Sequence, residues 1–320
     1  MSVRLPTPPE VETARANIAG VARRTPLWRL DAPTPPATTI WLKLENLQPL
    51  GSFKLRAGIN ALKCADPAQL RAGVIAPSAG NFGLGLAFAA RQMDLPVTIV
   101  APDTAAMAKT DALRTLGAAV VRIPFEAWWQ VLTTRHFDGA SGVFFHPVAM
   151  NEVIAGNATI AAEIIEDLDR FDAMVVPFGG GGLISGIGSV MRRLKPGVRM
   201  IAAEAETAGP AAAALAADRP KQVSHTPSFV DGIGSSTVLA EMWPLVRETV
   251  DAAAGASLDD IAASIRLLAT KHHVIAEGAG ATSVAVALAG CAGTGDIVCI
   301  VSGGNIDASK LGPILAGQTP

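Results

Sequence analysis

The chain has 320 residues, enough to bury a large core in one domain or in two closely packed domains. Its formal net charge of −2 provides no field that would attract nucleic acid or an anionic membrane, which favours a small ligand held by a local site. Three cysteines without metal-ligand spacing are typical of a reduced, cytoplasmic protein.

Membrane insertion is not indicated, although hydrophobic residues make up 50% of the sequence. No run approaches the roughly 20 apolar residues of a spanning helix. The N-terminus lacks an apolar signal core followed by small residues. We therefore expect a cytoplasmic protein that does not enter a membrane.

Short apolar runs alternate with helical patterns along most of the chain. Each run is typical of a buried strand, and each is followed by a loop or by the start of a helix. The predicted strands are 74–76, 97–101, 119–123, 174–176, 200–203 and 297–301. This order predicts a parallel α/β fold with right-handed crossovers, in which ligands bind at the carboxyl ends of the strands.

The segment from Glu45 to Arg56 places Lys54 between Phe53 and Leu55, just after a turn. Desolvation beside an aromatic ring would lower the pKa of this lysine and let it act as an amine nucleophile and then as a general base. A solvated surface lysine is the alternative. Arg56 has two equal interpretations: it forms a structural ion pair, or it is a residue of the site.

Three polar or glycine-rich segments follow predicted strands, namely 78–81, 179–182 and 302–305. The second consists of four glycines between a strand and a helix, where backbone amides can converge on an anion with the helix dipole behind them. A tight structural turn is the alternative. No Gly-Lys-Ser/Thr follows that would indicate a nucleotide loop.

These motifs together resemble the fold type II pyridoxal-phosphate (PLP) enzymes, which are tryptophan synthase β-like, and specifically the serine/threonine dehydratase and serine racemase group. Gly-Ser-Phe-Lys, Ser-Ala-Gly-Asn, the tetraglycine loop and Ser-Gly-Gly-Asn occur in the family's order, and the resemblance runs from Thr25 to Asn305. It implies an α/β fold with a large parallel-sheet domain that binds PLP, residues 1–69 and 146–320. A smaller open α/β domain, residues 70–145, would be inserted into it and would close over substrate.

The resemblance also implies roles for individual residues. Lys54 matches the Schiff-base lysine, and Phe53 matches the residue beside the pyridine ring. Asn81 matches the partner of the phenolic oxygen, and Ser302 that of the pyridine nitrogen. The matched phosphate cradle consists of Gly179, Gly180, Gly181, Gly182 and Leu183. The matched substrate loop consists of Ser78, Ala79, Gly80 and Asn81, with Phe82 as a further substrate-binding candidate.

Two more cofactor-binding candidates are Gly232 and Glu277. The alternative is that their segments have only structural roles, as a simple turn and as a capped helix. Glu204 matches the first acidic ligand of a divalent metal in this group, but Pro210 stands where a further aspartate ligand would be. We therefore expect no metal site and interpret Glu204 as a structural carboxylate at a strand end.

The activity implied by the resemblance is that of a PLP-dependent ammonia-lyase. Such an enzyme eliminates water from L-threonine, L-serine or a related β-hydroxy amino acid and releases a 2-oxo acid and ammonia. A serine at the pyridine nitrogen makes the ring a weaker electron sink, which favours elimination over transamination. Ala79 stands where racemases of the group carry a proton-donating serine, so we expect little racemisation.

Several alternatives remain at this point: phenylserine or 3-hydroxyaspartate as substrate, β-replacement, serine racemisation, and a non-catalytic PLP or amino-acid sensor. The segment 125–129, with Trp128 and Trp129, predicts either an apolar substrate pocket together with Phe82 and 148–150, or packing of the inserted domain or of a subunit contact.

We expect a homodimer or a higher homo-oligomer. Because the chain ends soon after Asn305, we expect no C-terminal regulatory domain.

Overall fold

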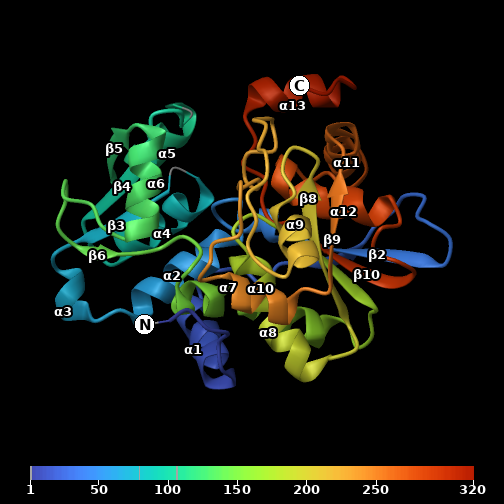
Figure 1. Ribbon diagram of the computed structural model, residues 1–320, viewed down its shortest axis with the longest axis horizontal. Coiled ribbons are helices and arrows are strands. Elements are labelled where there is room, and N and C mark those ends of the chain that lie inside the picture. Colours follow the sequence, from blue (N-terminus) through green and yellow to red (C-terminus); the bar gives the residue numbers. More distant parts are fainter. Residues whose placement is uncertain (1, 79, 106) are drawn as a thin grey trace.

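The computed structural model describes residues 2–78, 80–105 and 107–320 and contains two β-sheets, one on either side of a group of central helices (Figure 1). The larger sheet has six strands in the order β1-β2-β10-β7-β8-β9. These strands are β1 (Leu27–Arg29), β2 (Thr38–Lys43), β7 (Ala173–Pro177), β8 (Arg199–Ala205), β9 (Ala252–Ala256) and β10 (Gly295–Ile300). All neighbours in this sheet are parallel except β1, which runs antiparallel to β2.

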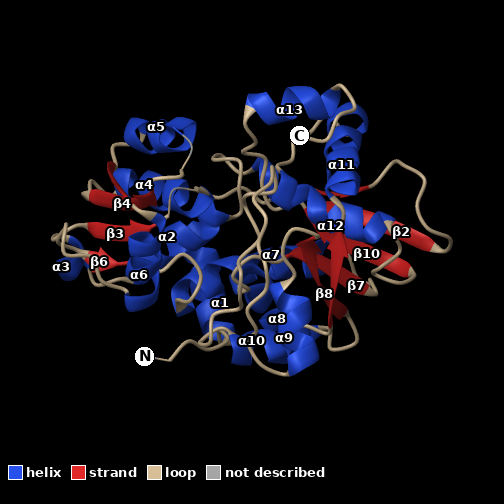
Figure 2. Cartoon of the chain, turned by 45° about the horizontal axis from the view of Figure 1, so that its top comes forward, coloured by secondary structure: helices blue, strands red, loops and turns tan. Residues whose placement is uncertain are grey.

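The smaller sheet has four parallel strands in the order β5-β4-β3-β6. These strands are β3 (Val74–Pro77), β4 (Val97–Pro102), β5 (Ala119–Ile123) and β6 (Val143–Phe144). Its helices are α3 (Pro67–Leu70), α4 (Asn81–Gln92), α5 (Met107–Thr115) and α6 (Phe125–Thr134). Figure 2 shows this sheet and its helices well separated from the six-stranded sheet.

The remaining helices surround the six-stranded sheet or lie between the two sheets (Figure 1). They are α1 (Pro8–Ile18), the 3-10 helix η1 (Glu45–Leu47), α2 (Lys54–Cys64), α7 (Asn151–Asp167), α8 (Gly182–Leu194), α9 (Pro210–Ala217), α10 (Trp243–Thr249), α11 (Leu258–Lys271), α12 (Gly278–Leu288) and α13 (Ala308–Leu315). Among the described residues, no helix has the length and apolar character needed to cross a lipid bilayer.

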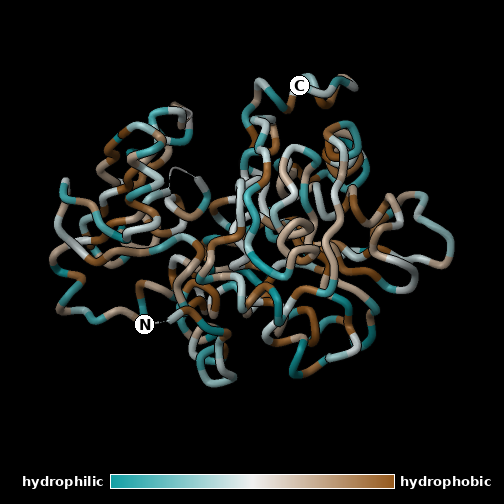
Figure 3. The backbone as a smooth tube through the Cα atoms, in the orientation of Figure 1, coloured by the Kyte–Doolittle hydropathy of each residue, from teal (hydrophilic) through white to brown (hydrophobic). Residues whose placement is uncertain are grey.

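Residues of the central strands alternate between two hydrophobic clusters, one on each face of the six-stranded sheet. In β7, Val175 packs in the cluster that contains α11 and α12, whereas Met174 and Val176 pack in the cluster that contains α7, α8 and α10. Burial on both faces explains why these strands are continuous apolar runs in the sequence. Figure 3 shows hydrophobic stretches, in brown, in both the part that contains the four-stranded sheet and the part that contains the six-stranded sheet.

The predicted α/β fold is confirmed, and each of the six predicted strands overlaps an observed one. The structure adds β1, β2, β6 and β9, which the apolar runs did not indicate. Strand β9 consists of alanines and one glycine, a composition with weak strand propensity, and it exists because it pairs with β8 along its whole length. Strand β6 is only two residues long.

Two glycines allow α2 and α4 to approach closely, which matters because these helices begin with Lys54 and Asn81. A Cβ atom added to Gly85 would lie 2.8 Å from the carbonyl oxygen of Lys54, and one added to Gly58 would lie 2.9 Å from backbone atoms of residues 85 and 86. Both contacts are with backbone, which cannot move aside as a flexible side chain can. The spacing between the first turns of the two helices therefore depends on these glycines.

We expect Gly85→Ala to destabilise the protein by about 1–3 kcal/mol, because the added methyl group overpacks the contact with α2. The measurement is urea-induced unfolding. Gly312→Ala in α13 is the matched control, since no heavy atom lies within 4 Å of its added Cβ. That control should be neutral or stabilising by up to about 1 kcal/mol. Equal effects of the two substitutions would contradict the close-packing argument.

Candidate active site

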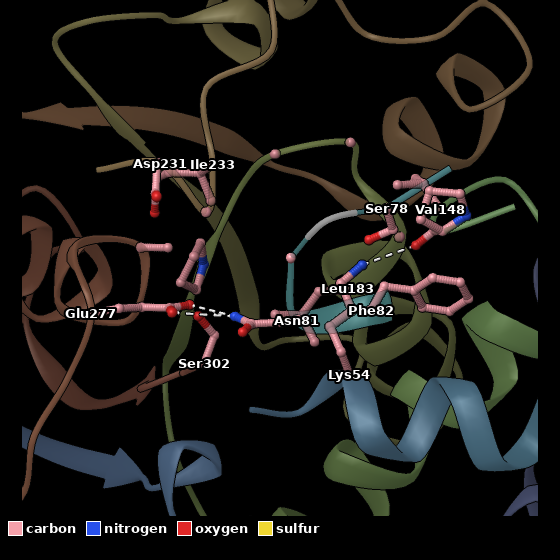
Figure 4. Close-up of a pocket in the computed structure, with 18 of the residues that line it drawn as sticks. Lys54, Ser78, Asn81, Phe82, Val148, Leu183, Asp231, Ile233, Glu277 and Ser302 are labelled. Carbon is pink, nitrogen blue, oxygen red and sulfur yellow. Dashed lines mark hydrogen bonds between the residues drawn. The ribbon is translucent and has the colours of Figure 1, made fainter. Parts of the chain in front are cut away.

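A cleft with a volume of about 530 Å³ lies between segments that belong to the two sheets and their helices. Figure 4 shows side chains from both sides pointing into it. The described residues that the sequence predicts for the site all line this cleft: Phe53, Lys54, Ser78, Gly80, Asn81, Phe82, Gly179, Gly180, Gly181, Gly182, Leu183, Gly232, Glu277 and Ser302. Ala79, the remaining candidate, lies outside the described residues.

Lys54 is the first residue of α2 and lines the cleft. Its Nζ donates a hydrogen bond of 2.9 Å to the carbonyl oxygen of Pro147. The same atom lies 5.2 Å from the ring centroid of Phe53 and 5.7 Å from that of Phe82. Burial lowers the pKa of Lys54 to about 8, so a substantial fraction of the amine is neutral in mildly alkaline solution. Lys54 is thus a desolvated lysine and not a solvated surface one.

The tetraglycine loop connects β7 to α8. Gly181 occupies the N-cap position with a φ of +87°, a left-handed conformation that glycine adopts without strain. A Cβ on Gly180 would lie 2.8 Å from both methyl groups of Val148, so a side chain there has no room. The loop therefore presents backbone amides, and the positive end of the dipole of the 13-residue helix α8, to the cleft.

Asn81 takes part in a hydrogen-bond network that crosses the cleft (Figure 4). Its Nδ2 donates to Glu277 Oε1 at 2.9 Å and to Oε2 at 3.2 Å, while Nδ2 of Asn305 donates to its Oδ1 at 2.8 Å. Burial raises the pKa of Glu277 to about 7 even though Asn81 donates to its carboxylate. The network fixes the orientation of the Asn81 amide. Asn81 and Glu277 stand in separate sequence motifs, and neither motif predicts their contact.

Ser302 follows β10 and is buried beside the segment that precedes Lys54. The backbone amide of Phe53 donates to the carbonyl oxygen of Ser302 at 3.1 Å, and Ser52 forms a β-bridge with Gly303. Two motifs about 250 residues apart in sequence are therefore joined by backbone hydrogen bonds. Ser302 and Lys54 both line the cleft as a result.

The cleft is also lined by residues that no sequence motif indicates, among them Thr104 and Lys109. The ammonium group of Lys109, on α5, forms an ion pair with Asp231, which lies in the loop that carries Gly232. This contact joins the α5 side of the cleft to the opposite wall. Lys109 stands in an ordinary helical pattern, so no local signal in the sequence distinguishes it from a solvated lysine.

The two tryptophans of α6 have different environments. Trp128 lines the cleft, and its Nε1 donates a hydrogen bond of 3.1 Å to the carbonyl oxygen of Val100 in β4. Trp129 does not line the cleft, and the rings of the two residues contact each other at a centroid distance of 6.5 Å. Trp128 therefore both packs against the four-stranded sheet and forms part of the cleft wall.

Arg56 and Glu204 have structural contacts away from the cleft lining. Arg56 is fully buried in ion pairs with Glu45 and Glu163. The carboxylate of Glu204 accepts hydrogen bonds from the amides of Ala211 at 2.6 Å and Ala212 at 3.0 Å, at the start of α9. Among the residues that the structure describes, no group of three His, Cys, Asp or Glu side chains is placed to hold a metal ion.

Comparison with known proteins is consistent with this geometry. Residues 18–303 match the family model described as pyridoxal-phosphate dependent enzyme. L-threonine ammonia-lyase of Thermotoga maritima is 39% identical over 280 residues, which are 86% of this chain and 69% of that protein. Serine racemase of Bos taurus is 32% identical over 315 residues, 94% of this chain and 93% of that protein.

Among solved structures, the processed form of threonine deaminase isoform 2 from Solanum lycopersicum superposes with a TM-score of 0.85 and 28% identity, covering 99% of this chain and 96% of that chain. The similarity of fold and the match over most of the sequence indicate the same family. The chain belongs to the family of pyridoxal-phosphate dependent enzymes.

Proposed function

We propose that this chain is a PLP-dependent ammonia-lyase that eliminates water from L-threonine, L-serine or a related β-hydroxy amino acid and releases a 2-oxo acid and ammonia. The observation that carries the proposal is the convergence of Lys54, Asn81, Ser302 and the tetraglycine loop in one cleft. The similarity to L-threonine ammonia-lyases supports the reaction class.

The lining of the cleft fits PLP. The glycine loop offers backbone amides where a Cβ at residue 180 would collide with Val148, which suits a phosphate group. Lys54 supplies a buried amine with a pKa of about 8, Asn81 an oriented amide, and Ser302 a hydroxyl. When bound, PLP supplies an electron sink for the negative charge that develops on the α-carbon of the substrate.

Lys54 has the chemistry of both anchor and base in this proposal. Its neutral amine would hold the cofactor through the cofactor's carbonyl group and, when free, would take the proton from the substrate's α-carbon. The rings of Phe53 and Phe82 lie beside the amine, at 5.2 and 5.7 Å from Nζ to the ring centroids. Ser302, a neutral partner for the pyridine nitrogen, favours expulsion of the β-hydroxyl over transamination, because it does not stabilise a charged ring.

The substrate carboxylate is assigned to the N-terminus of α4. Gly80 is the N-cap residue of this helix, and the side chain of Ser78 accepts a hydrogen bond of 3.2 Å from the amide of Gly83. The backbone amides and the helix dipole at a helix N-terminus favour an anion. Ala79 belongs to the same loop in sequence and has no proton to give, which favours elimination over racemisation.

The side chain of the substrate faces a mixed wall. Phe82, Val148 and Trp128 are apolar, whereas Lys109 is already paired with Asp231. A second substrate carboxylate would have to displace Asp231 or lose its hydration without a partner, which costs several kcal/mol. We therefore favour a methyl or larger apolar β-substituent over 3-hydroxyaspartate.

The domain boundaries that we propose are 1–69 with 146–320 for the PLP-binding domain and 70–145 for the substrate-loop domain. They agree with the division of the strands, because β3 to β6 form one sheet and the other strands form the second. We also propose that the protein forms a homo-oligomer and that it is located in the cytoplasm.

The test is release of 2-oxo acid from L-serine, L-threonine, phenylserine and 3-hydroxyaspartate, with formation of D-serine followed in parallel. We expect kcat/KM to be lowest for 3-hydroxyaspartate and elimination to exceed racemisation. Trp128→Ala should reduce turnover of threonine and phenylserine more than that of serine. Faster interconversion of the serine enantiomers than elimination would identify a racemase, and no turnover of any of the four substrates would contradict the proposed function.

A further inference from the structure

His146 lies beside the site but outside the lining of the cleft, in the segment between β6 and α7. Only 2% of its surface is exposed. Its Nδ1 accepts hydrogen bonds from the backbone amides of Val148, at 3.1 Å, and of Ala149, at 2.7 Å. A ring nitrogen that accepts two N–H groups carries no hydrogen, so the proton of the neutral imidazole is on Nε2.

The neutral state of His146 is favoured strongly. Burial lowers its pKa to about 3, and the cations Arg135 and Lys54 act in the same direction. Nε2 has no hydrogen-bond partner among the described residues. The imidazole is thus a permanent acceptor for the turn from residue 146 to residue 149. It does not change its charge in the pH range where the enzyme would work.

This turn controls what Lys54 contacts. Pro147 has no amide hydrogen, so the amides of Val148 and Ala149 are the next two donors of the turn, and both bond to His146. Their fixed positions determine where the carbonyl of Pro147 points. That carbonyl oxygen accepts the hydrogen bond from Nζ of Lys54 at 2.9 Å.

The same turn also supports the glycine loop. The methyl groups of Val148 occupy the space next to Gly180, and the carbonyl oxygen of Val148 would lie 3.3 Å from a Cβ on Gly182. A shift of the turn would therefore move the acceptor of Lys54 and one wall of the phosphate cradle together. No other side chain bonds to the amides of residues 148 and 149 among the described contacts.

We infer that His146 is a positioning residue, which holds the 146–149 turn so that the carbonyl of Pro147 orients the amine of Lys54 in the cleft. The inference rests on the role proposed above for Lys54. A neutral amine that donates one N–H to this carbonyl keeps its lone pair free for the proton on the substrate's α-carbon. Loss of the turn would leave Lys54 in place, but its amine would no longer be oriented towards the substrate's α-carbon.

The test compares His146→Asn with His146→Gln. Asparagine places its Oδ1 as many bonds from the backbone as Nδ1 of histidine, so it can accept both amides, whereas the longer glutamine places its oxygen where Nε2 was. We expect His146→Gln to lower kcat by about 10- to 100-fold with KM changed by less than about threefold, because a misplacement of about 1 Å can cost 10²-fold. His146→Asn should stay within about threefold of the native kcat.

A readout that does not depend on turnover is the rate at which PLP recombines with the cofactor-free protein. This rate follows the neutral fraction of Lys54. In His146→Gln its midpoint should move to higher pH, because water that reaches the amine relieves the desolvation that lowers the pKa. In His146→Asn the midpoint should stay at its native position.

Equal losses in both variants, or no loss in His146→Gln, would overturn the inference. Should neither variant fold, ¹⁵N NMR of the native protein decides, with His146 assigned by eliminating the four other histidines. A non-titrating imidazole with its proton on Nε2 supports the inference, and a titrating one overturns it. The proposed function fails separately, if Lys54→Ala still forms the covalent link with PLP.

Discussion

Replacement of Lys54 by alanine should abolish the covalent attachment of PLP and reduce turnover by on the order of 10⁴-fold. Alanine removes the buried amine whose pKa of about 8 makes it both nucleophile and base in the cleft. PLP should still bind weakly through the glycine loop and Ser302. Borohydride reduction would trap the covalent link, and peptide mass spectrometry would then detect the added mass of the cofactor. We expect this mass on the peptide that contains Lys54 in the native protein and on no peptide in the variant.

Lys63 provides the matched control, because it is the other lysine of α2 and lies at the opposite end of the helix. Its ammonium group donates to the carbonyl oxygen of Asn17 at 2.5 Å in a solvent-exposed contact. Lys63→Ala should keep the covalent link and most of the activity. Native-like trapping of PLP in Lys54→Ala would refute the assignment of Lys54.

The sequence predicted the fold well where burial is two-sided. Strands β7 and β10 are packed by helices on both faces, so their residues are almost all apolar and the runs stand out from the helical pattern. The two edge strands of the same sheet, β1 and β9, lack this burial on both faces. Strand β1 is antiparallel and only three residues long, and its formation depends on pairing with β2, which no local preference reveals.

The candidate site was predictable to the extent that its groups come from short motifs. Lys54, Asn81, Ser302 and the glycine loop each stand in a recognisable segment, and all line one cleft. The contacts between motifs were not predictable. The hydrogen bond that Asn81 donates to Glu277 joins residues 196 apart, and the ion pair of Lys109 with Asp231 joins residues 122 apart. Such partners are set by the topology, not by the local sequence.

Arg56 shows the same limit, because the sequence left its role open and the structure places it in a buried ion network. Its guanidinium donates to both oxygens of Glu45 at 2.8 Å, and to Glu163 at 2.6 and 2.9 Å. Lys43 also bonds to Glu163, at 2.6 Å. The two basic and two acidic groups balance, and they join β2, η1, α2 and α7.

We expect Arg56→Ala to destabilise the protein by about 3–5 kcal/mol, because it leaves two buried carboxylates with Lys43 as their remaining cation. Although burial acts to raise the pKa of Glu45, Arg56 holds that pKa below its usual value, so the native carboxylate is charged. Arg56→Lys should retain the positive charge but lose the paired hydrogen bonds. The stability of this variant should therefore lie between that of the native protein and that of Arg56→Ala. Urea-induced unfolding measures these differences.

Two further variants separate the buried network from simple loss of an arginine. Arg24 pairs with Glu166 and Asp167 but its side chain is 47% exposed, so Arg24→Ala should cost no more than about 1 kcal/mol. Adding Glu45→Gln to Arg56→Ala should recover part of the lost stability, since it removes one of the uncompensated charges. If Arg56→Ala costs no more than Arg24→Ala, the network does not determine the position of α2. The start of that helix, and Lys54 with it, would then be held mainly by the glycine contact with α4.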